Sequence, residues 1–255
     1  MKAPKPNILH RDDHFLALDK TAGLASVRER WTDNESALVV VWDLLRAEDP
    51  DARKPRVVHR LDKETSGVIL FATSLVAARS LSRQFREREV DKTYLALVRG
   101  TPPEEGGTIE LLLREDPYHP GRSVVARKRG KPAVTEWTRT EPFAGYALLT
   151  MRPKTGRMHQ IRISLATLGY PLLVDPAYAG GRELNLSDLK RTYKHKKGRE
   201  ERPLIKRVSL HAAAIAFKHP ITGERVEIET PPPKDFSLAL KYLRKFRPLR
   251  ERRGL

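Results

Sequence analysis

One aspartate of this chain stands among cations in a polar segment that directly follows an apolar run. The segment reads Val58-His59-Arg60-Leu61-Asp62-Lys63-Glu64-Thr65-Ser66-Gly67. Neighbouring cations favour the ionised form of a carboxyl group, and an ionised carboxylate can act as a nucleophile or a base near neutral pH. The same spacing also fits a structural ion pair where a strand ends. Asp62 is therefore a candidate catalytic residue with a structural alternative.

The composition indicates a polyanionic partner. The 255 residues include 49 Lys and Arg against 32 Asp and Glu, which gives a formal net charge of +17. Such an excess favours RNA, DNA or an anionic membrane, although a merely basic cytosolic protein is the alternative. Without cysteine, disulfides, thiolate chemistry and Cys-based zinc sites are excluded. No apolar run reaches about 18 residues and no secretory signal is present, so we expect a soluble, cytoplasmic protein.

Short strands mixed with a few helices are predicted, which is typical of an α+β domain. Ser36 and Ser74 are expected to cap helices, the first of which ends at Pro50 and the second of which runs through Phe85. A third helix is predicted over 159–168. The strands are predicted over 8–25 (a strand or hairpin that turns at Gly23), 57–62, 68–72, 93–99, 133–140 and 146–152.

Two strongly basic segments depart from this pattern. They are Leu189 to Arg207 and the tail from Lys241 to Arg253. Solvated surface and contact with an RNA backbone are equally good interpretations, since Lys and Arg bind phosphates without sequence preference.

The segment around Asp62 resembles a known signature. HRLDKETSG is similar to the HRLDxxTSG motif of the RluA class of pseudouridine synthases, in which the aspartate is the catalytic residue. Asp91 to Val98 resembles that family's Lys-x-Tyr strand, which assigns to Tyr94 the packing against the target base. Arg152 to Arg162 resembles the motif P-x-T-G-R-x-H-Q-I-R, whose final arginine pairs with the catalytic aspartate, and that role falls on Arg162.

Two further matches extend the resemblance from about Ile8 to Phe236. They lie at Gly169 to Tyr178 and at Leu210 to Pro220, and the departures Ser164 and Val174 touch none of the proposed chemistry. The resemblance implies an α+β pseudouridine synthase fold with a mostly antiparallel, mixed central sheet, flanking helices and loops, and a catalytic cleft across the sheet. It further implies a catalytic domain over 1–236 without an N-terminal S4-like domain, followed by a basic tail over 237–255.

The implied activity is isomerisation of uridine to pseudouridine in ribosomal or transfer RNA by a monomer, with no cofactor and no metal. Tyr94 would stack on the uracil and accept the proton from C5, the alternative being a core tyrosine. The target nucleotide must be extruded from its stack, and Arg60 resembles the family arginine that fills the vacated space. His59 braces the loop or takes part in the reaction. The other candidate substrate contacts are Thr65, Lys154, Arg157, His159 and Gln160, for several of which a solvated face is the alternative.

Functions of other classes explain less of the sequence. A non-catalytic RNA-binding protein accounts for the charge but leaves Asp62, Tyr94 and Arg162 unexplained. A metal-dependent nuclease or phosphotransferase that uses His59 and Asp62 would need more clustered carboxylates or histidines. A kinase catalytic loop has a different residue order.

Overall fold

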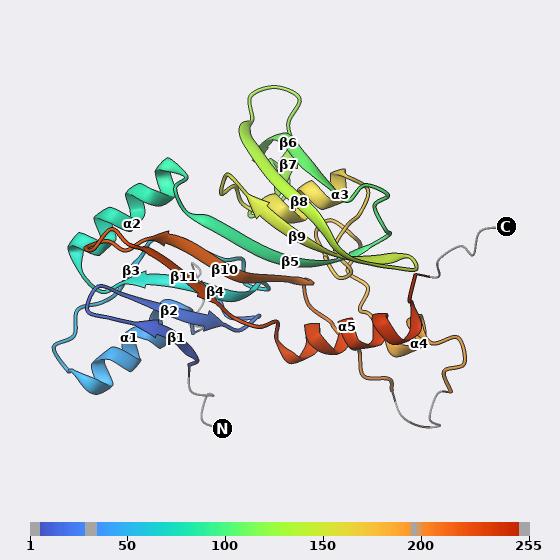
Figure 1. The fold of residues 1–255 in the computed structure, drawn as a ribbon, viewed down its shortest axis with the longest axis horizontal. Coiled ribbons are helices and arrows are strands. Elements are labelled where there is room, and N and C mark those ends of the chain that lie inside the picture. The colour runs from blue at the N-terminus through green and yellow to red at the C-terminus, as the bar shows by residue number, and fades with distance from the viewer. Residues whose placement is uncertain (1–5, 29–34, 195–197, 199, 250–255) are drawn as a thin grey trace. The chain divides into compact units, whose positions relative to one another are not determined.

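The protein divides into two compact units of similar construction. The computed structural model describes residues 6–28, 35–194, 198 and 200–249. Unit 1 comprises Met1–Thr93 and His211–Pro231, and unit 2 comprises Tyr94–Leu210 and Pro232–Leu255. Each unit contains helices together with a largely antiparallel group of strands, so the predicted α+β class is confirmed (Figure 1). No helix in the described part of the chain is both long enough and apolar enough to span a membrane.

The sheet of unit 1 is organised around β4 (Ser66–Ala72), which follows the loop that carries Asp62. β4 pairs antiparallel with β2 and β3 and parallel with β10. All seven residues of β4 are buried, as expected for a strand covered on both faces. The other strands of this unit are β1 (Ile8–Arg11), β2 (Phe15–Lys20), β3 (Arg56–Val57), β10 (Leu210–Lys218) and β11 (Arg225–Glu229).

Both helices of unit 1 begin where serine caps were predicted. The side chain of Ser36 accepts a backbone N–H at the start of α1 (Ala37–Glu48), and Ser74 does the same for α2 (Leu75–Glu87). A serine that accepts such a bond satisfies one of the N–H groups that a helix start leaves without a partner. Both predicted caps are therefore confirmed, and Figure 1 shows the strands of unit 1 between α2 and α1.

The segment predicted over 8–25 forms a hairpin of β1 and β2, in whose turn the carboxylate of Asp12 accepts two backbone N–H groups. After β2 the chain turns at Gly23, as predicted, with a φ of 86°. Another local prediction in unit 1 was wrong. The strand predicted over 57–62 ends at Val57. The chain then continues as a loop to Asp62, so Val57 is the only residue of the predicted strand that pairs within the sheet.

The sheet of unit 2 is antiparallel throughout and confirms the strands predicted between residues 93 and 152. Its order is β5-β9-β8-β6-β7. A register shift in β8, between Arg139 and Glu141, marks a bulge in its pairing with β9. The strands are β5 (Asp91–Arg99), β6 (Gly106–Glu115), β7 (Ser123–Val125), β8 (Lys131–Phe143) and β9 (Tyr146–Pro153).

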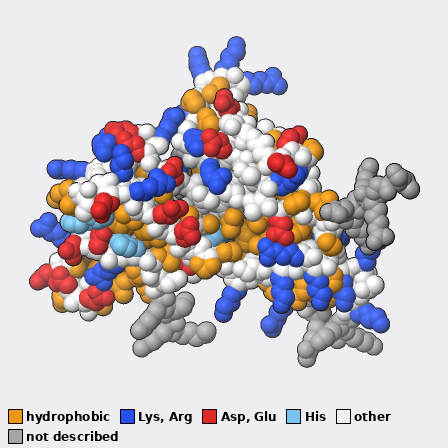
Figure 2. All heavy atoms as spheres, viewed as in Figure 1, with side chains coloured by type: hydrophobic (Ala, Val, Ile, Leu, Met, Phe, Trp, Pro, Cys, Tyr) orange, Lys and Arg blue, Asp and Glu red, His pale blue; other side chains and the backbone are white. Residues whose placement is uncertain are grey.

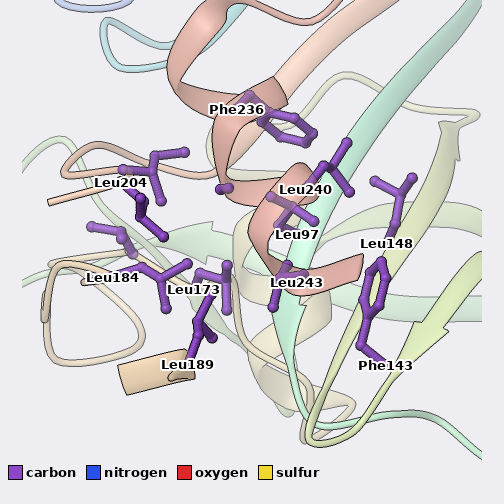
Figure 3. Packing of buried hydrophobic residues seen from close by; sticks show 13 residues of the cluster. Leu97, Phe143, Leu148, Leu173, Leu184, Leu189, Leu204, Phe236, Leu240 and Leu243 are labelled. Atoms are coloured by element: carbon purple, nitrogen blue, oxygen red, sulfur yellow. The ribbon is translucent and has the colours of Figure 1, made fainter. Parts of the chain in front are cut away.

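Alternate residues of β5 separate the core of unit 2 into two clusters. Ala96 belongs to the cluster that contains residues of α3 (Gln160–Thr167), the predicted third helix. Leu97 belongs to the cluster that contains residues of α5 (Lys234–Phe246), shown in Figure 3. Since successive side chains of a strand point to opposite faces, the two helices cover opposite faces of this sheet. A short helix, α4 (Leu186–Leu189), lies beside α5.

The basic C-terminal segment contributes to the core of unit 2. The boundary predicted after residue 236 falls inside α5, where Phe236, Ala239, Leu240 and Leu243 are all buried. The basic segment 189–207 likewise supplies buried residues to the same cluster. Residues 195–197, 199 and 250–255 of these two segments lie outside the described residues. Both segments therefore combine a basic surface with an apolar inner face.

Candidate active site

Asp62 lies in a loop of unit 1 between two buried positions. The residue is partly exposed, whereas Leu61 before it and Thr65 after it are buried. The backbone N–H of Thr65 donates to the carbonyl of Asp62 at 3.0 Å, which closes a tight turn. The turn presents the carboxylate at the surface while its neighbours anchor the backbone.

A serine far away in the sequence holds the residue before Asp62. The hydroxyl of Ser26 donates to the carbonyl oxygen of Leu61 at 2.6 Å and accepts the N–H of Leu61 at 2.9 Å. Ser26 and Leu61 are both buried, so each bond replaces one that water would otherwise make. The backbone orientation just before Asp62 is thereby determined by one side chain.

A buried lysine holds the residue after Asp62. The side chain of Lys20 is fully buried, and its Nζ donates to the carbonyls of Lys63, Leu24 and Thr21 at 3.0, 2.8 and 3.0 Å. The carbonyl of Lys63 also accepts the N–H of Gly23 at 2.9 Å. Burying an ammonium group is costly unless hydrogen bonds compensate it, and these carbonyls supply that compensation.

A buried serine and histidine anchor the end of the loop where β4 begins. The Nε2 of His211 lies 3.1 Å from the carbonyl oxygen of Thr230, which can only accept, so Nε2 carries the hydrogen. Nδ1 is then an acceptor, and the hydroxyl of Ser66 donates to it at 3.0 Å. The next residue, Gly67, approaches the backbone of Ala212 so closely that a Cβ would lie 2.1 Å from a carbonyl oxygen.

His59 braces the loop as a neutral ring. Its Nε2 accepts the backbone N–H of Leu70 at 2.9 Å, and its ring stacks on Phe85 at a centroid distance of 4.6 Å. Burial lowers the pKa of His59 to about 3, with a smaller contribution to this shift from the nearby charge of Lys92. Burial also lowers the pKa of Lys92 itself, to about 8. Of the two roles predicted for His59, the geometry supports bracing.

Tyr94 is the first residue of unit 2 and lies on β5. It pairs with Met151 of β9, and its partly buried ring packs against the core cluster on the α3 side of the sheet. Packing on one side and partial exposure fit either interpretation, a stacking residue or a core tyrosine.

Arg162 is buried in unit 2 and held by a carboxylate that the sequence analysis did not assign. Its Nε donates to Asp175 Oδ2 at 2.8 Å and its Nη2 to Asp175 Oδ1 at 2.7 Å. The side chains of Arg162 and Asp175 are only 8% and 1% exposed, so this fork of two charge-assisted bonds is shielded from solvent. The pairing of Arg162 with Asp62 stays a prediction.

A tyrosine fixes the surroundings of this ion pair. The ring of Tyr178 lies beneath the Arg162 guanidinium at 5.4 Å, and its hydroxyl hydrogen bonds with the backbone of Ser123. Burial raises the pKa of the Tyr178 phenol. His159 places its Nδ1 3.2 Å from the same hydroxyl, so its ring belongs to the packing around Arg162.

Gln160 anchors the turn that precedes Arg162. Its Oε1 accepts from the hydroxyl of Thr155 at 2.7 Å and from the N–H of Arg157 at 3.0 Å. Its Nε2 donates to Val134 and Thr135 at 2.9 Å each. Because both ends of this buried amide bond within the fold, the geometry gives Gln160 a structural part, and its contact with RNA stays a prediction.

The remaining predicted contacts differ in exposure. Arg60 and Lys154 are exposed, and Lys154 pairs with Glu136 at 2.7 Å. Arg157 is partly buried and donates to the carbonyl of Pro132. Thr65 is buried, and its hydroxyl has no hydrogen-bond partner in the described part of the chain.

Four residues that position the candidate site have no role predicted from the sequence: Lys20, Ser26, Asp175 and His211. Asp175 gave a detectable signal, since it is a lone carboxylate directly after the apolar run Leu172 to Val174. A charge next to a buried run usually needs a buried partner. Ser26 and Lys20 gave no such signal, because their partners are backbone atoms of a distant loop.

The described residues form an α+β protein with a carboxylate on a held loop of unit 1 and a buried, paired arginine in unit 2. Comparisons with known proteins identify the family. Residues 14–167 match the family described as RNA pseudouridylate synthase. The ribosomal large subunit pseudouridine synthase C of Salmonella typhi is 39% identical over 239 residues, covering 93% of this chain and 70% of that protein.

Other relatives agree. The dual-specificity RNA pseudouridine synthase RluA of Pasteurella multocida is 39% identical, covering 90% of this chain and 94% of that protein. The solved structure of human RNA pseudouridylate synthase domain containing 4 superposes with a TM-score of 0.71 at 25% identity, over 93% of each chain. The chain belongs to the RNA pseudouridylate synthase family, and the predicted family, fold and class of enzyme, an RNA uridine isomerase, are confirmed.

Proposed function

We propose that Asp62 is the carboxylate with which this isomerase converts uridine to pseudouridine. The observation that carries the proposal is the loop itself. Asp62 is partly exposed, while the residues before and after it are held by Ser26 and by Lys20. A reactive group on a preorganised backbone keeps its geometry during the reaction, which is what a catalytic loop requires.

The reaction breaks the bond between N1 of uracil and C1′ of ribose, turns the base within the site and joins C5 to C1′. The proton on C5 then leaves, and N1 takes up a proton, so the product is an isomer of the substrate. Asp62 assists either by attacking the sugar or by abstracting a sugar proton, and both routes need the carboxylate ionised.

Two residues of unit 2 are proposed to act with Asp62. Tyr94 stacks on the uracil ring and accepts the proton from C5. Arg162 pairs with Asp62 and keeps it ionised and oriented. The fork between Arg162 and Asp175 supports this role, because it orients the guanidinium before substrate arrives.

The proposed substrate is ribosomal or transfer RNA. The printed names of the relatives describe one as a ribosomal large subunit enzyme and another as a dual-specificity RNA enzyme. Arg60 is proposed to fill the space that the extruded nucleotide leaves, since it is exposed and two residues from Asp62. The other proposed substrate contacts are Thr65, Arg157, His159, Gln160 and His59. We further propose that the protein is a cytoplasmic monomer and that the reaction needs no metal.

Release of tritium from RNA labelled at uracil C5 tests the reaction directly. Ribosomal and transfer RNA fractions are incubated separately with wild type, Asp62→Asn and Asp51→Asn, each with and without excess chelator. Asp51 is an exposed carboxylate in the same unit and serves as the matched control. We expect wild type and Asp51→Asn to release tritium from at least one fraction, and Asp62→Asn to fall below about one thousandth of that rate.

Each result has a defined meaning. Equal release by Asp62→Asn and wild type would contradict the role of Asp62, and release that chelator abolishes would contradict a metal-independent reaction. Binding of RNA without release from any fraction would favour the non-catalytic RNA-binding alternative.

A further inference from the structure

The charge of the protein is concentrated in one unit. Unit 1 contains 19 Lys and Arg against 18 Asp and Glu, a net charge of +1. Unit 2 contains 30 Lys and Arg against 14 Asp and Glu, a net charge of +16. A field this asymmetric attracts a polyanion mainly to unit 2.

Helix α5 displays part of this charge on an ordered surface. Its buried residues lie in the core cluster of Figure 3, so its other side faces outward. Lys234, Lys241 and Lys245 are exposed and follow each other at spacings of seven and four residues. These spacings place them along one side of an α-helix, over a length of about 16 Å.

The carboxylates near α5 are already engaged by arginines. Glu141 pairs with Arg244 at 2.7 Å, and Asp235 pairs with Arg207 at 2.6 Å. Within the described residues, Lys234, Lys241 and Lys245 make no ion pair. Their charge is therefore uncompensated by neighbouring side chains.

The segment before β10 extends the same basic surface. It packs with α5 in one core cluster through Leu189, Leu204 and Ile205. Figure 2 shows Lys and Arg side chains gathered over the part of this face where Figure 1 draws α5. Among the described residues of the segment, the exposed cations are Arg191, Lys194, Arg202 and Lys206.

We propose that the outward side of α5, with Lys234, Lys241 and Lys245 at its centre, is a second RNA contact that binds the phosphate backbone of the substrate. The proposal rests on the proposed function, because it assumes that the polyanion is the RNA being modified. An anionic membrane fits less well. A helix that binds a membrane surface inserts an apolar face into it. The apolar face of α5 is instead buried in the protein, and Leu238 is the one large apolar side chain of this helix that is exposed, at 40%.

The salt dependence of RNA binding tests this surface. The triple variant Lys234→Gln, Lys241→Gln, Lys245→Gln is compared with wild type in binding to an RNA fraction that wild type modifies. Each phosphate contact contributes about 0.7 to 0.9 to the slope of log K against log salt, so we expect the slope to fall by about 2 to 3. The ratio of the wild-type affinity to the affinity of the variant should then fall by about 20- to 40-fold between about 50 and about 200 mM salt.

The matched control removes three cations from unit 1. Arg79, Arg83 and Arg86 are exposed on α2, where Glu87 and Glu89 pair with two of them, so their triple replacement by Gln should leave the slope within about 1 of wild type. Replacing the three lysines of α5 by Arg should preserve the slope. At saturating RNA, the α5 Gln variant should release tritium at the wild-type rate.

An unchanged slope in the α5 Gln variant, or an equal loss in the α2 variant, would overturn the proposal. Lysine-dependent binding to vesicles with anionic lipid, without any effect on RNA, would assign α5 to a membrane instead. These outcomes are separate from the tests of the proposed function, which compare tritium release by wild type and Asp62→Asn and do not depend on the lysines of α5.

Discussion

The two units hold their candidate catalytic residues by different means. In unit 1, Asp62 lies on a loop whose backbone is held by several separate hydrogen bonds from Ser26 and Lys20. In unit 2, Arg162 lies on a helix and is held through its own side chain by Asp175. The loop residue is thus positioned through its backbone by several hydrogen bonds, whereas the helix residue is held through its side chain by the two charge-assisted bonds of a buried ion pair. Removing one partner of the ion pair in unit 2 should therefore cause a large loss of unfolding free energy. Removing a single hydrogen bond from the Asp62 loop of unit 1 should cause a smaller loss.

The largest effect is expected when Asp175 is replaced by Ala. Arg162 would keep its charge in a site where only 8% of its side chain is exposed, and breaking a buried pair from one side costs about 3 to 5 kcal/mol of unfolding free energy. Urea unfolding followed by circular dichroism measures the loss.

The double variant Arg162→Met, Asp175→Leu separates stability from catalysis. Two well-packed apolar side chains should recover most of the stability, because no buried charge remains. Tritium release should stay abolished if Arg162 serves Asp62. If Asp175→Ala lost less than about 1 kcal/mol of unfolding free energy, the ion pair of unit 2 would contribute no more than an exposed pair, and the contrast with unit 1 would be wrong.

His59 should make the stability of unit 1 depend on pH. The ring in the unfolded chain takes up a proton as pH falls through 6.5, whereas the folded ring does so only near 3. Protonation therefore favours unfolding, so the contribution is complete above pH 6.5 and is lost between 6.5 and 3. Wild type should lose about 2 kcal/mol between about pH 6.5 and 4.5, and His59→Gln should lose correspondingly less.

Two carboxylates with shifted pKa values act below the interval between about pH 6.5 and 4.5. The pKa values of Asp12 and Asp235 are lowered from 3.8, so their contributions are lost only as the pH falls below that value. An NMR titration in which the His59 ring changes protonation near pH 6 would contradict the prediction.

A smaller effect is expected for Ser66→Ala, at about 1 to 2 kcal/mol. The substitution leaves the buried Nδ1 of His211 without its donor, and an unsatisfied buried group costs more than the bond it lost. Since Ser66 follows the Asp62 turn, tritium release should show a lower kcat with KM nearly unchanged. Ser66→Thr keeps the hydroxyl and should restore kcat more than stability, because its extra methyl group must fit a packed site. Parallel loss of folded protein and activity, with kcat per folded molecule unchanged, would assign Ser66 to stability alone.

These effects also show where sequence reasoning succeeds. The caps Ser36 and Ser74 were predictable because a cap bonds within three residues of itself. The strands β5, β8 and β9 of unit 2 were likewise predictable from their local sequence, whereas β6 and β7 were not predicted. Asp62 was recognised through a contiguous motif. The bond between Ser66 and His211 joins residues 145 positions apart, and no local pattern predicts it.

The helix α5 was missed for a related reason. Its basic residues dominate the composition of the segment, whereas its apolar residues Phe236, Ala239, Leu240 and Leu243 are spaced as one helix face. The charge predicted either solvated surface or RNA contact, and neither interpretation included a buried face, although an amphipathic helix needs both kinds of residue. The helical spacing of the apolar residues could have predicted α5, but the many basic residues of the segment dominated the interpretation.

The smallest effect is expected for Glu136→Gln, the exposed counterpart of Asp175→Ala within unit 2. Glu136 pairs with Lys154 at 2.7 Å, a distance equal to that between Arg162 Nη2 and Asp175 Oδ1. Its side chain is 47% exposed against 1% for Asp175, so water replaces the lost partner and the cost should be at most about 1 kcal/mol. The same urea titration measures both variants. Equal losses would mean that pair geometry governs stability here, whereas a difference of several-fold would assign the effect to burial, as expected if the buried bond to Asp175 is what holds the side chain of Arg162 in place.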